Sequence, residues 1–187
     1  MLEQYVLLVC SFFWGLQTTT PSKDQVSSCE DIVIASLNTG EDPALMLSIA
    51  WNESAFKTTE TSKAGAVGPL QVLPRYWCPK GRKKGCDLVA AGFKAWTTYF
   101  EMEEGDELQA LCRYNSGKKC GKSPRAKRYA KRVLKTRDTL VKSLYSSWYD
   151  RYVQDQCARC PDCCVKVTQA GFVDEYGVER PHDWLPD

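Results

Sequence analysis

The sequence predicts one mainly helical domain of the α+β class, and three observations support this. An Asp or Ser cap precedes an apolar helical pattern at Asp42, Asp87 and Ser123. Strand-like pieces are short and confined to residues 57–86. The 187 residues are 43% apolar and 26% charged, with 25 basic and 23 acidic side chains, which excludes a disordered or collagen-like chain and fits one globular domain.

The first two helices of this domain follow one another closely. A Ser-Ser-Cys-Glu sequence starting at Ser27 is a capping box and predicts the start of a helix that Gly40 ends. Asp42 and Pro43 then form a cap followed by proline at the first helical position, and they open the apolar segment ALMLSIAWNESAF. A helix this apolar should be buried, yet it carries the carboxyl group of Glu53.

The remaining helices follow a segment of loops or short strands at residues 57–86, which is rich in Thr, Ser, Gly and Pro. We expect a helix from Leu88 to Glu104 behind the cap Asp87, a shorter one at 107–114, and a long one that begins at Ser123-Pro124. The long helix is expected to reach residue 150, with a break near residues 146–147.

Both ends of the chain differ from this domain. Tyr5–Leu16 is an apolar run interrupted only by Ser11; it is too short to cross a membrane, since about 20 residues are needed, but it has the length of a signal-peptide core. No Lys or Arg precedes it, so a buried helix is the alternative. We therefore expect a signal or anchor with linker at 1–24, the helical domain at 25–148 and a cysteine-rich appendage at 149–187.

Basic residues are concentrated at the end of the short expected helix 107–114 and along the long helix that follows it. Residues 113–142 contain twelve Lys or Arg and one acidic residue, Asp138, which gives a net charge of +11 although the whole chain has +2. Such a segment could attract an anionic cell envelope, bind nucleic acid or simply be solvated. We favour the envelope and expect no nucleic-acid partner.

Ten cysteines favour an oxidising compartment or a metal site. Two pairs flank seven-residue loops and are candidates for local disulfides, namely Cys78 with Cys86 and Cys112 with Cys120. The tail has Cys157, Cys160, Cys163 and Cys164, for which disulfides, free thiols or a zinc site completed by His182 are open alternatives. We expect no metal or cofactor elsewhere. Removal of the N-terminal run would delete Cys10 and leave an odd number, with Cys29 also unexplained.

Three short blocks carry the candidate chemistry. The first is Glu53-Ser54, at the end of the buried helix; the second is the glycine-rich loop 62–72 with Gln71; the third is Tyr114-Asn115, near a helix end. A carboxyl group held against Trp51 and neighbouring apolar residues is partly desolvated, which raises its pKa and lets it donate a proton near neutral pH. Neutral amides can bind sugar hydroxyl and acetamido groups.

These blocks resemble the signatures of the soluble lytic transglycosylase family, which has a goose-type-lysozyme-like fold. The matching sequences are E-S at Glu53, G-P-L-Q at 68–71 and Y-N at Tyr114; a fourth segment at 126–134, which contains Tyr129, is similar to the closing helix of the family. The resemblance covers about residues 27–136 and implies the same mainly α, lysozyme-like fold. Pro69 and Arg113 depart from the usual family residues; Arg113 could pair with a carboxylate of the peptide stem or be solvated.

The resemblance also implies roles for these residues. Glu53 matches the single catalytic acid, which would cleave the β-1,4 bond between N-acetylmuramic acid and N-acetylglucosamine and form a 1,6-anhydro ring. Gln71, Tyr114 and Asn115 match substrate-positioning residues, while Tyr129 and Ser54 match residues that orient the acid.

The expected function is therefore that of a lytic transglycosylase that opens the cell wall locally. Alternatives are a hydrolytic lysozyme, or a structural component of a bacteriophage virion or secretion machine that binds or degrades the wall, with its partner held by the C-terminal tail. The expected location is accordingly the periplasm or cell envelope, or the virion.

Overall fold

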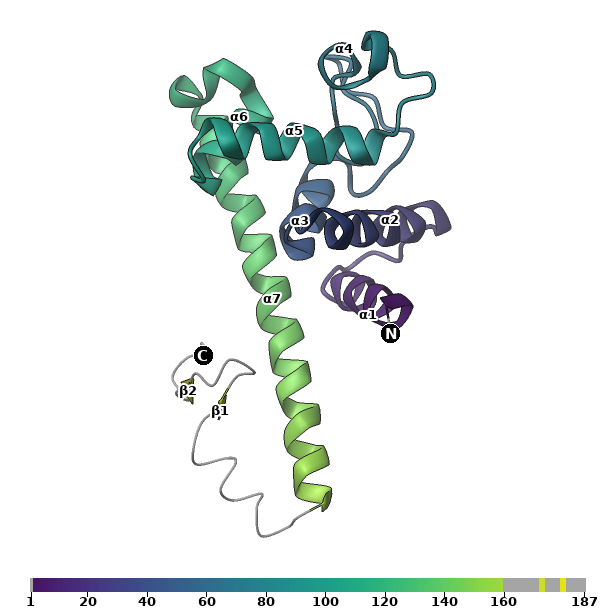
Figure 1. Cartoon of the computed structure of the whole chain (residues 1–187), viewed down its shortest axis with the longest axis vertical. Coiled ribbons are helices and arrows are strands. Elements are labelled where there is room, and N and C mark those ends of the chain that lie inside the picture. The colour runs from purple at the N-terminus through teal and green to yellow at the C-terminus, as the bar shows by residue number, and fades with distance from the viewer. Residues whose placement is uncertain (1, 160–171, 174–178, 181–187) are drawn as a thin grey trace. The chain divides into compact units, whose positions relative to one another are not determined.

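Figure 1 shows a computed structural model of the chain, which describes residues 2–159, 172–173 and 179–180. The chain divides into two units, Met1–Val141 and Lys142–Asp187. The first unit contains all three candidate blocks. The second contains the end of the long helix and a short antiparallel pair of strands, in which Phe172 pairs with Arg180.

The elements are mostly helices, which confirms the predicted mainly α class. Only the last two elements are strands, and both are two residues long. In chain order the elements are α1 (Leu2–Gly15), α2 (Lys23–Thr39), α3 (Pro43–Ser54), α4 (Pro74–Trp77), the 3₁₀ helix η1 (Pro79–Gly81), α5 (Leu88–Met102), α6 (Glu107–Ser116), the 3₁₀ helix η2 (Gly117–Lys122), α7 (Pro124–Arg159), β1 (Phe172–Val173) and β2 (Glu179–Arg180).

The observed helix starts match the predicted ones where a single capping residue precedes the helix, and they differ where two residues could cap it. Asp42 and Asp87 cap α3 and α5 as predicted, and each accepts a hydrogen bond from a backbone N–H of the first turn. The start predicted at Ser27 is wrong. The capping box is formed instead by Ser22, whose hydroxyl accepts from the N–H of Gln25 while the Gln25 side chain accepts from the Ser22 N–H.

The break predicted near residues 146–147 is also wrong, because α7 continues to Arg159. Residues 125–159 contain neither Gly nor Pro, so no residue there forces a helix to end. The cysteines at 160, 163 and 164 and His182 lie outside the described residues, as does most of the predicted tail, so the zinc and partner hypotheses for that region stay predictions.

The segment between α3 and α5 consists of loops, as expected, and of the short helices α4 and η1, which the sequence did not predict. It contains two isolated bridges, Thr61 with Val67 and Val67 with Val72, in place of longer strands. Gly68 has a φ of 77°, and an added Cβ would lie 2.8 Å from Leu88, so this position needs glycine both for its backbone and for its packing. The space beside Gly68 is therefore filled by the side chain of Leu88 and is not open to a ligand.

The N-terminal apolar run forms α1 and packs within the first unit. Val6, Val9, Cys10 and Phe13 are spaced as on one side of a helix and are all buried. Cys10 forms a disulfide with Cys29 of α2, which accounts for the two cysteines that the sequence left unpaired. The described residues include no helix with both the length and the hydropathy needed to span a membrane.

Candidate active site

Glu53 lies in the last turn of α3, where the helix leaves the core. The helix is buried from Ala44 to Ala50 and becomes partly exposed only at Trp51 and beyond. The chain then turns sharply, because Ala55 and Phe56 both have left-handed backbone conformations with φ of 52° and 65°. The acid is therefore held at the edge of the core, with access to solvent on one side.

Burial raises the pKa of the Glu53 carboxyl from its ordinary value of 4.5 to about 7. Two weaker effects act in the opposite direction, a hydrogen bond from Tyr129 and the positive charge of Arg132. Although Glu53 keeps some solvent contact, the surrounding protein is dense enough for desolvation to dominate. A carboxyl group with this pKa can both donate and accept a proton near neutral pH.

Tyr129 and Arg132, both on α7, form the polar surroundings of this acid. The Tyr129 hydroxyl is buried and makes no hydrogen bond of good geometry to any described residue, so its interaction with the Glu53 carboxyl is a loose hydrogen bond. Arg132 donates from Nε to the side-chain oxygen of Asn52 at 2.6 Å, and its guanidinium lies 5.9 Å from the centre of the Tyr129 ring. Asn52 thus fixes Arg132 beside the acid.

Hydrogen bonds join the three predicted blocks to one another. The Ser54 hydroxyl donates to the carbonyl of Pro69 at 2.8 Å, and the Tyr114 hydroxyl donates to the carbonyl of Leu70 at 2.7 Å. Tyr114 also lies close enough to Glu53 for the carboxylate charge to raise the pKa of the phenol, an effect second to that of its burial. The first and third blocks therefore both hold the backbone of the second, and Ser54 contacts that backbone where we expected it to orient the acid.

Gln71 and Asn115 differ in how much of each side chain is already bound. The Gln71 amide nitrogen donates to the carbonyls of Gly68 and Glu60, at 2.9 and 3.2 Å, and Gln71 has a positive φ of 47°. Its nitrogen therefore stabilises its own loop, which leaves the oxygen for a ligand. Asn115 is exposed at the end of α6 and makes no side-chain hydrogen bond to another described residue.

A row of aromatic side chains extends from the third block. The ring of Tyr99 lies 6.2 Å from that of Tyr114 and 5.5 Å from that of Trp77, with both contacts edge-on. Tyr76 is 65% exposed and lies near Tyr99. Partly exposed aromatic rings offer apolar faces and polar edges, which suit the two sides of a sugar ring.

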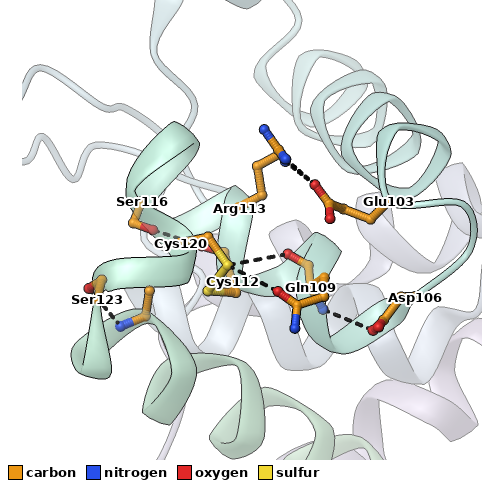
Figure 2. The surroundings of a disulfide bond; sticks show 9 residues. Glu103, Asp106, Gln109, Cys112, Arg113, Ser116, Cys120 and Ser123 are labelled. Atoms are coloured by element: carbon orange, nitrogen blue, oxygen red, sulfur yellow. Dashed lines mark hydrogen bonds and ion pairs between the residues drawn. A yellow bond between two sulfur atoms is a disulfide. The ribbon is translucent and has the colours of Figure 1, made fainter.

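Two disulfides close the loops on either side of this row. Cys78 is bonded to Cys86 and Cys112 to Cys120, the pairs that the loop lengths indicated. Figure 2 shows the second bond, which joins α6 to η2 beside Gln109 and is followed by the Ser123 cap of α7. The bond closes the turn that follows Tyr114 and limits how far the end of α6 can move.

Arg113 has a partner within the protein. Its guanidinium forms an ion pair with the carboxylate of Glu103, just beyond the end of α5, and Figure 2 shows the two side chains pointing toward each other. The sequence suggested that Arg113 either pairs with a peptide-stem carboxylate or is solvated, and the structure pairs it with Glu103 instead. Its charge is largely balanced, which weakens the hypothesis that it binds a peptide-stem carboxylate.

Sequence reasoning missed Arg132, Trp77 and Tyr99. Arg132 was counted only as one of twelve cations, although its position three residues after Tyr129 places it on the same side of a helix and could have identified it. Tyr99 follows Trp96 by three residues, but no local signal distinguishes it from a core aromatic. Trp77 lies in α4, and only the folding of the segment between α3 and α5 brings its ring next to Tyr99.

Outside this site, the described residues form a groove but no candidate metal cluster. They include no group of three or more His, Cys, Asp or Glu side chains suited to a metal ion. A groove of about 700 Å³ lies between α2 and α5 and is lined by Ile34, Ala35, Phe93 and Thr97 among others, but none of its lining residues belongs to the predicted blocks.

Comparison with known protein families agrees with the resemblance seen in the sequence. A family model described as "Transglycosylase SLT domain" matches residues 31–136, more than half of the chain. The match includes Glu53, Gln71, Tyr114, Asn115 and Tyr129, and it begins after α1. A search of curated proteins found no match to the chain.

Proposed function

The chain belongs to the transglycosylase SLT domain family, and from this premise we propose that it cleaves the β-1,4 bond between N-acetylmuramic acid and N-acetylglucosamine and forms a 1,6-anhydro end. Processing of peptidoglycan is the general activity of the family. The observation that carries the finer proposal is the Glu53 carboxyl, whose pKa of about 7 suits a group that must first give up a proton and then take one.

In the first step Glu53 acts as the acid. Its protonated carboxyl donates a proton to the glycosidic oxygen while the bond from that oxygen to the anomeric carbon breaks, and the electron pair of the bond goes to the oxygen. Positive charge develops on the sugar ring as it does so. Burial keeps Glu53 protonated before this step, and Arg132 and Tyr129 then stabilise the carboxylate that forms.

In the second step the same carboxylate acts as the base. It takes the proton of the muramoyl 6-hydroxyl, whose oxygen bonds to the anomeric carbon and closes the anhydro ring. Glu53 recovers its proton, so no water is consumed and one group serves for the whole cycle. The usual hydrolytic routes need two carboxyl groups. Among the described residues, the charged group that shifts the pKa of Glu53 is the cation Arg132 and not a second carboxylate, which is consistent with a route that uses one carboxyl group.

The remaining predicted residues are proposed to hold the glycan. The Gln71 side-chain oxygen and the exposed Asn115 amide would bind acetamido or hydroxyl groups, and Tyr99 and Trp77 would contact the faces of sugars further from the cut. Tyr114 would act mainly by fixing the Leu70 carbonyl and the loop that carries Gln71.

The products of digestion test this proposal. Purified peptidoglycan incubated with the full-length protein is expected to release fragments with 1,6-anhydro ends, each lighter by one water than a reducing-end fragment, which mass spectrometry of the muropeptides would detect. Reducing ends would contradict the proposed route and indicate a hydrolase. Binding without release of fragments would indicate a wall-binding structural component of a virion or secretion machine.

We also propose that the protein acts outside the cytoplasm, in the periplasm, the cell envelope or a virion. All six cysteines described in the first unit are in disulfides, which persist in oxidising compartments. Fractionation of producing cells tests this, because recovery in the cytoplasm with free thiols would contradict it. We propose that the N-terminal run is retained, because its removal would expose buried contacts and leave Cys29 without its disulfide partner, and N-terminal sequencing of the mature protein tests this.

A basic segment between α6 and the middle of α7 supports an anionic partner in the envelope. We define it as Lys118, Lys119, Lys122, Arg125, Lys127, Arg128, Lys131 and Lys135. All eight side chains are exposed, and none is in an ion pair with a described residue. Arg113 and Arg137, which are paired with acids, do not belong to it.

Binding to whole cell walls should therefore weaken as salt increases. Raising NaCl from about 0.05 to about 0.5 M shortens the screening length severalfold, so we expect the fraction that sediments with walls to fall. Replacing Lys127, Lys131 and Lys135 by Gln should reduce both the binding and its salt dependence, whereas the same change at Lys23, Lys57 and Lys94, which are exposed and lie outside the basic segment, should not. Equal binding to walls stripped of anionic polymers, or tighter binding to DNA, would contradict this proposal.

A further inference from the structure

Helix α1 lies outside the matched family region but is built into the same unit as the acid. Its buried side is formed by residues at helical spacing, and Phe13 is fully buried while Leu7 and Leu8, on the other side, are 48% and 40% exposed. The bond between Cys10 and Cys29 ties this helix to α2. The N-terminal run is therefore an element that the chain adds to the family domain.

The end of α1 contacts the two aromatic residues that flank Glu53 in the sequence. The ring of Phe13 lies 5.2 Å from Phe56 and 5.9 Å from Trp51. Trp14 lies 5.2 Å from Phe56 and 6.0 Å from Trp51. Each of the two flanking residues is thus packed against both aromatic residues of α1.

This packing acts where the backbone needs support. Ala55 and Phe56, the second and third residues after the acid, have left-handed conformations that cost on the order of 1–3 kcal/mol each for residues other than glycine. Such a conformation persists only where the surroundings fix it. Phe56 is fully buried in the aromatic cluster, and Gln25 of α2 donates to the Ala55 carbonyl at 2.7 Å.

We propose that α1 is a positioning element for Glu53, acting through the contacts of Phe13 and Trp14 with Trp51 and Phe56, and that the bond from Cys10 to Cys29 holds it in place. This inference rests on the proposed role of Glu53 as the catalytic acid. It adds residues outside the family region to the set on which the reaction depends. None of them belongs to the residues proposed above to hold the glycan.

Replacing Phe13 by Ala tests the proposal. Loss of this ring should loosen the turn at 55–56 and hydrate the acid, so we expect kcat to fall by about tenfold or more, as small misplacements of reacting groups do, with KM changed less than about threefold. The high-pH limit of activity should move to lower pH, because a better hydrated Glu53 has a lower pKa and loses its proton earlier. Phe13→Leu, which keeps an apolar side chain, should restore most of both.

Two variants separate positioning from general destabilisation. Phe93 of α5 is also a buried phenylalanine, so Phe93→Ala should lower Tm with an unchanged pH limit, and Leu8→Ala should change neither. The double change Cys10→Ser with Cys29→Ser should reproduce the Phe13→Ala profile in a milder form. A folded Phe13→Ala protein with the original kcat and pH limit, or a Phe93→Ala protein with the same shift, would overturn the proposal.

A second measurement keeps this result distinct from failure of the proposed function. The Glu53 carboxyl can be titrated by NMR in the full-length protein without any substrate. A lower pKa in Phe13→Ala than in the unaltered protein is expected if α1 positions the acid, and an unchanged value would overturn that. If Glu53→Gln kept full activity, the catalytic role would fail whatever this titration gave.

Discussion

Glu53→Gln is expected to lose its activity on peptidoglycan by about 10³-fold or more, because one side chain is proposed to supply both the acid and the base. The amide has nearly the shape of the protonated carboxyl, so the change removes the proton and leaves the packing. Initial rates of release of anhydro muropeptides would measure it. In the unaltered protein the same rate should fall above about pH 7, where Glu53 loses its proton.

Two control variants show whether the loss concerns chemistry or binding. Glu53→Gln should still sediment with peptidoglycan, since the aromatic row and the loop of Gln71 are unchanged. Trp77→Ala should behave in the opposite way and weaken binding. Loss of one aromatic contact with the sugar costs about 1 kcal/mol, which predicts that KM rises about fivefold. The pH above which kcat falls should not change. Residual activity of Glu53→Gln within about tenfold of the unaltered protein would contradict the assignment of the acid.

The parts of this structure that the sequence predicts well are those decided by local chemistry. Asp42 and Asp87 cap helices because an Asp side chain can reach the free N–H groups of the first turn that follows it. The raised pKa of Glu53 could be anticipated in part, since the acid ends a helix that is too apolar to be exposed, although the burial itself comes from segments packed around that helix. Seven-residue loops likewise bring the cysteines of two pairs together.

The parts that the sequence does not predict depend on contacts between distant segments. The spacing from Tyr129 places Arg132 on the same side of α7, but its contact with Asn52, 80 residues away in the sequence and next to Glu53, arises only in the folded protein. Tyr114 contacts the second block through the Leu70 carbonyl, a backbone atom with no sequence signature. The sequence does not show which positions of α1 are buried, because both sides of this helix are apolar. Its composition is therefore that of a signal peptide, although its buried residues have the spacing of one side of a packed helix.

Stability of the protein should depend on pH through Glu53, and this is the second large effect that we expect. The pKa of this carboxyl is about 7 in the folded state and near 4.5 when the chain is unfolded. Below pH 4.5 the group is neutral in both states and costs nothing. As pH rises toward 7 only the unfolded chain ionises, so the folded state loses about 1.4 kcal/mol per pH unit, and above pH 7 the loss is constant at about 3 kcal/mol.

Glu53→Gln, which cannot ionise, should therefore be more stable than the unaltered protein at pH 8 and similar to it at pH 4. Urea unfolding of both proteins at pH 4, 6 and 8 with the disulfides intact would give the difference, which we expect to change by about 3 kcal/mol across this range. Glu101→Gln, at an exposed position on α5, is the matched control and should show no such change. A pH-independent difference would mean that Glu53 is no less hydrated in the folded state than in the unfolded chain, and the same desolvation could then not keep it protonated for catalysis. The loss of folding free energy at high pH thus measures how far the fold raises the pKa of Glu53 and so keeps it protonated for catalysis.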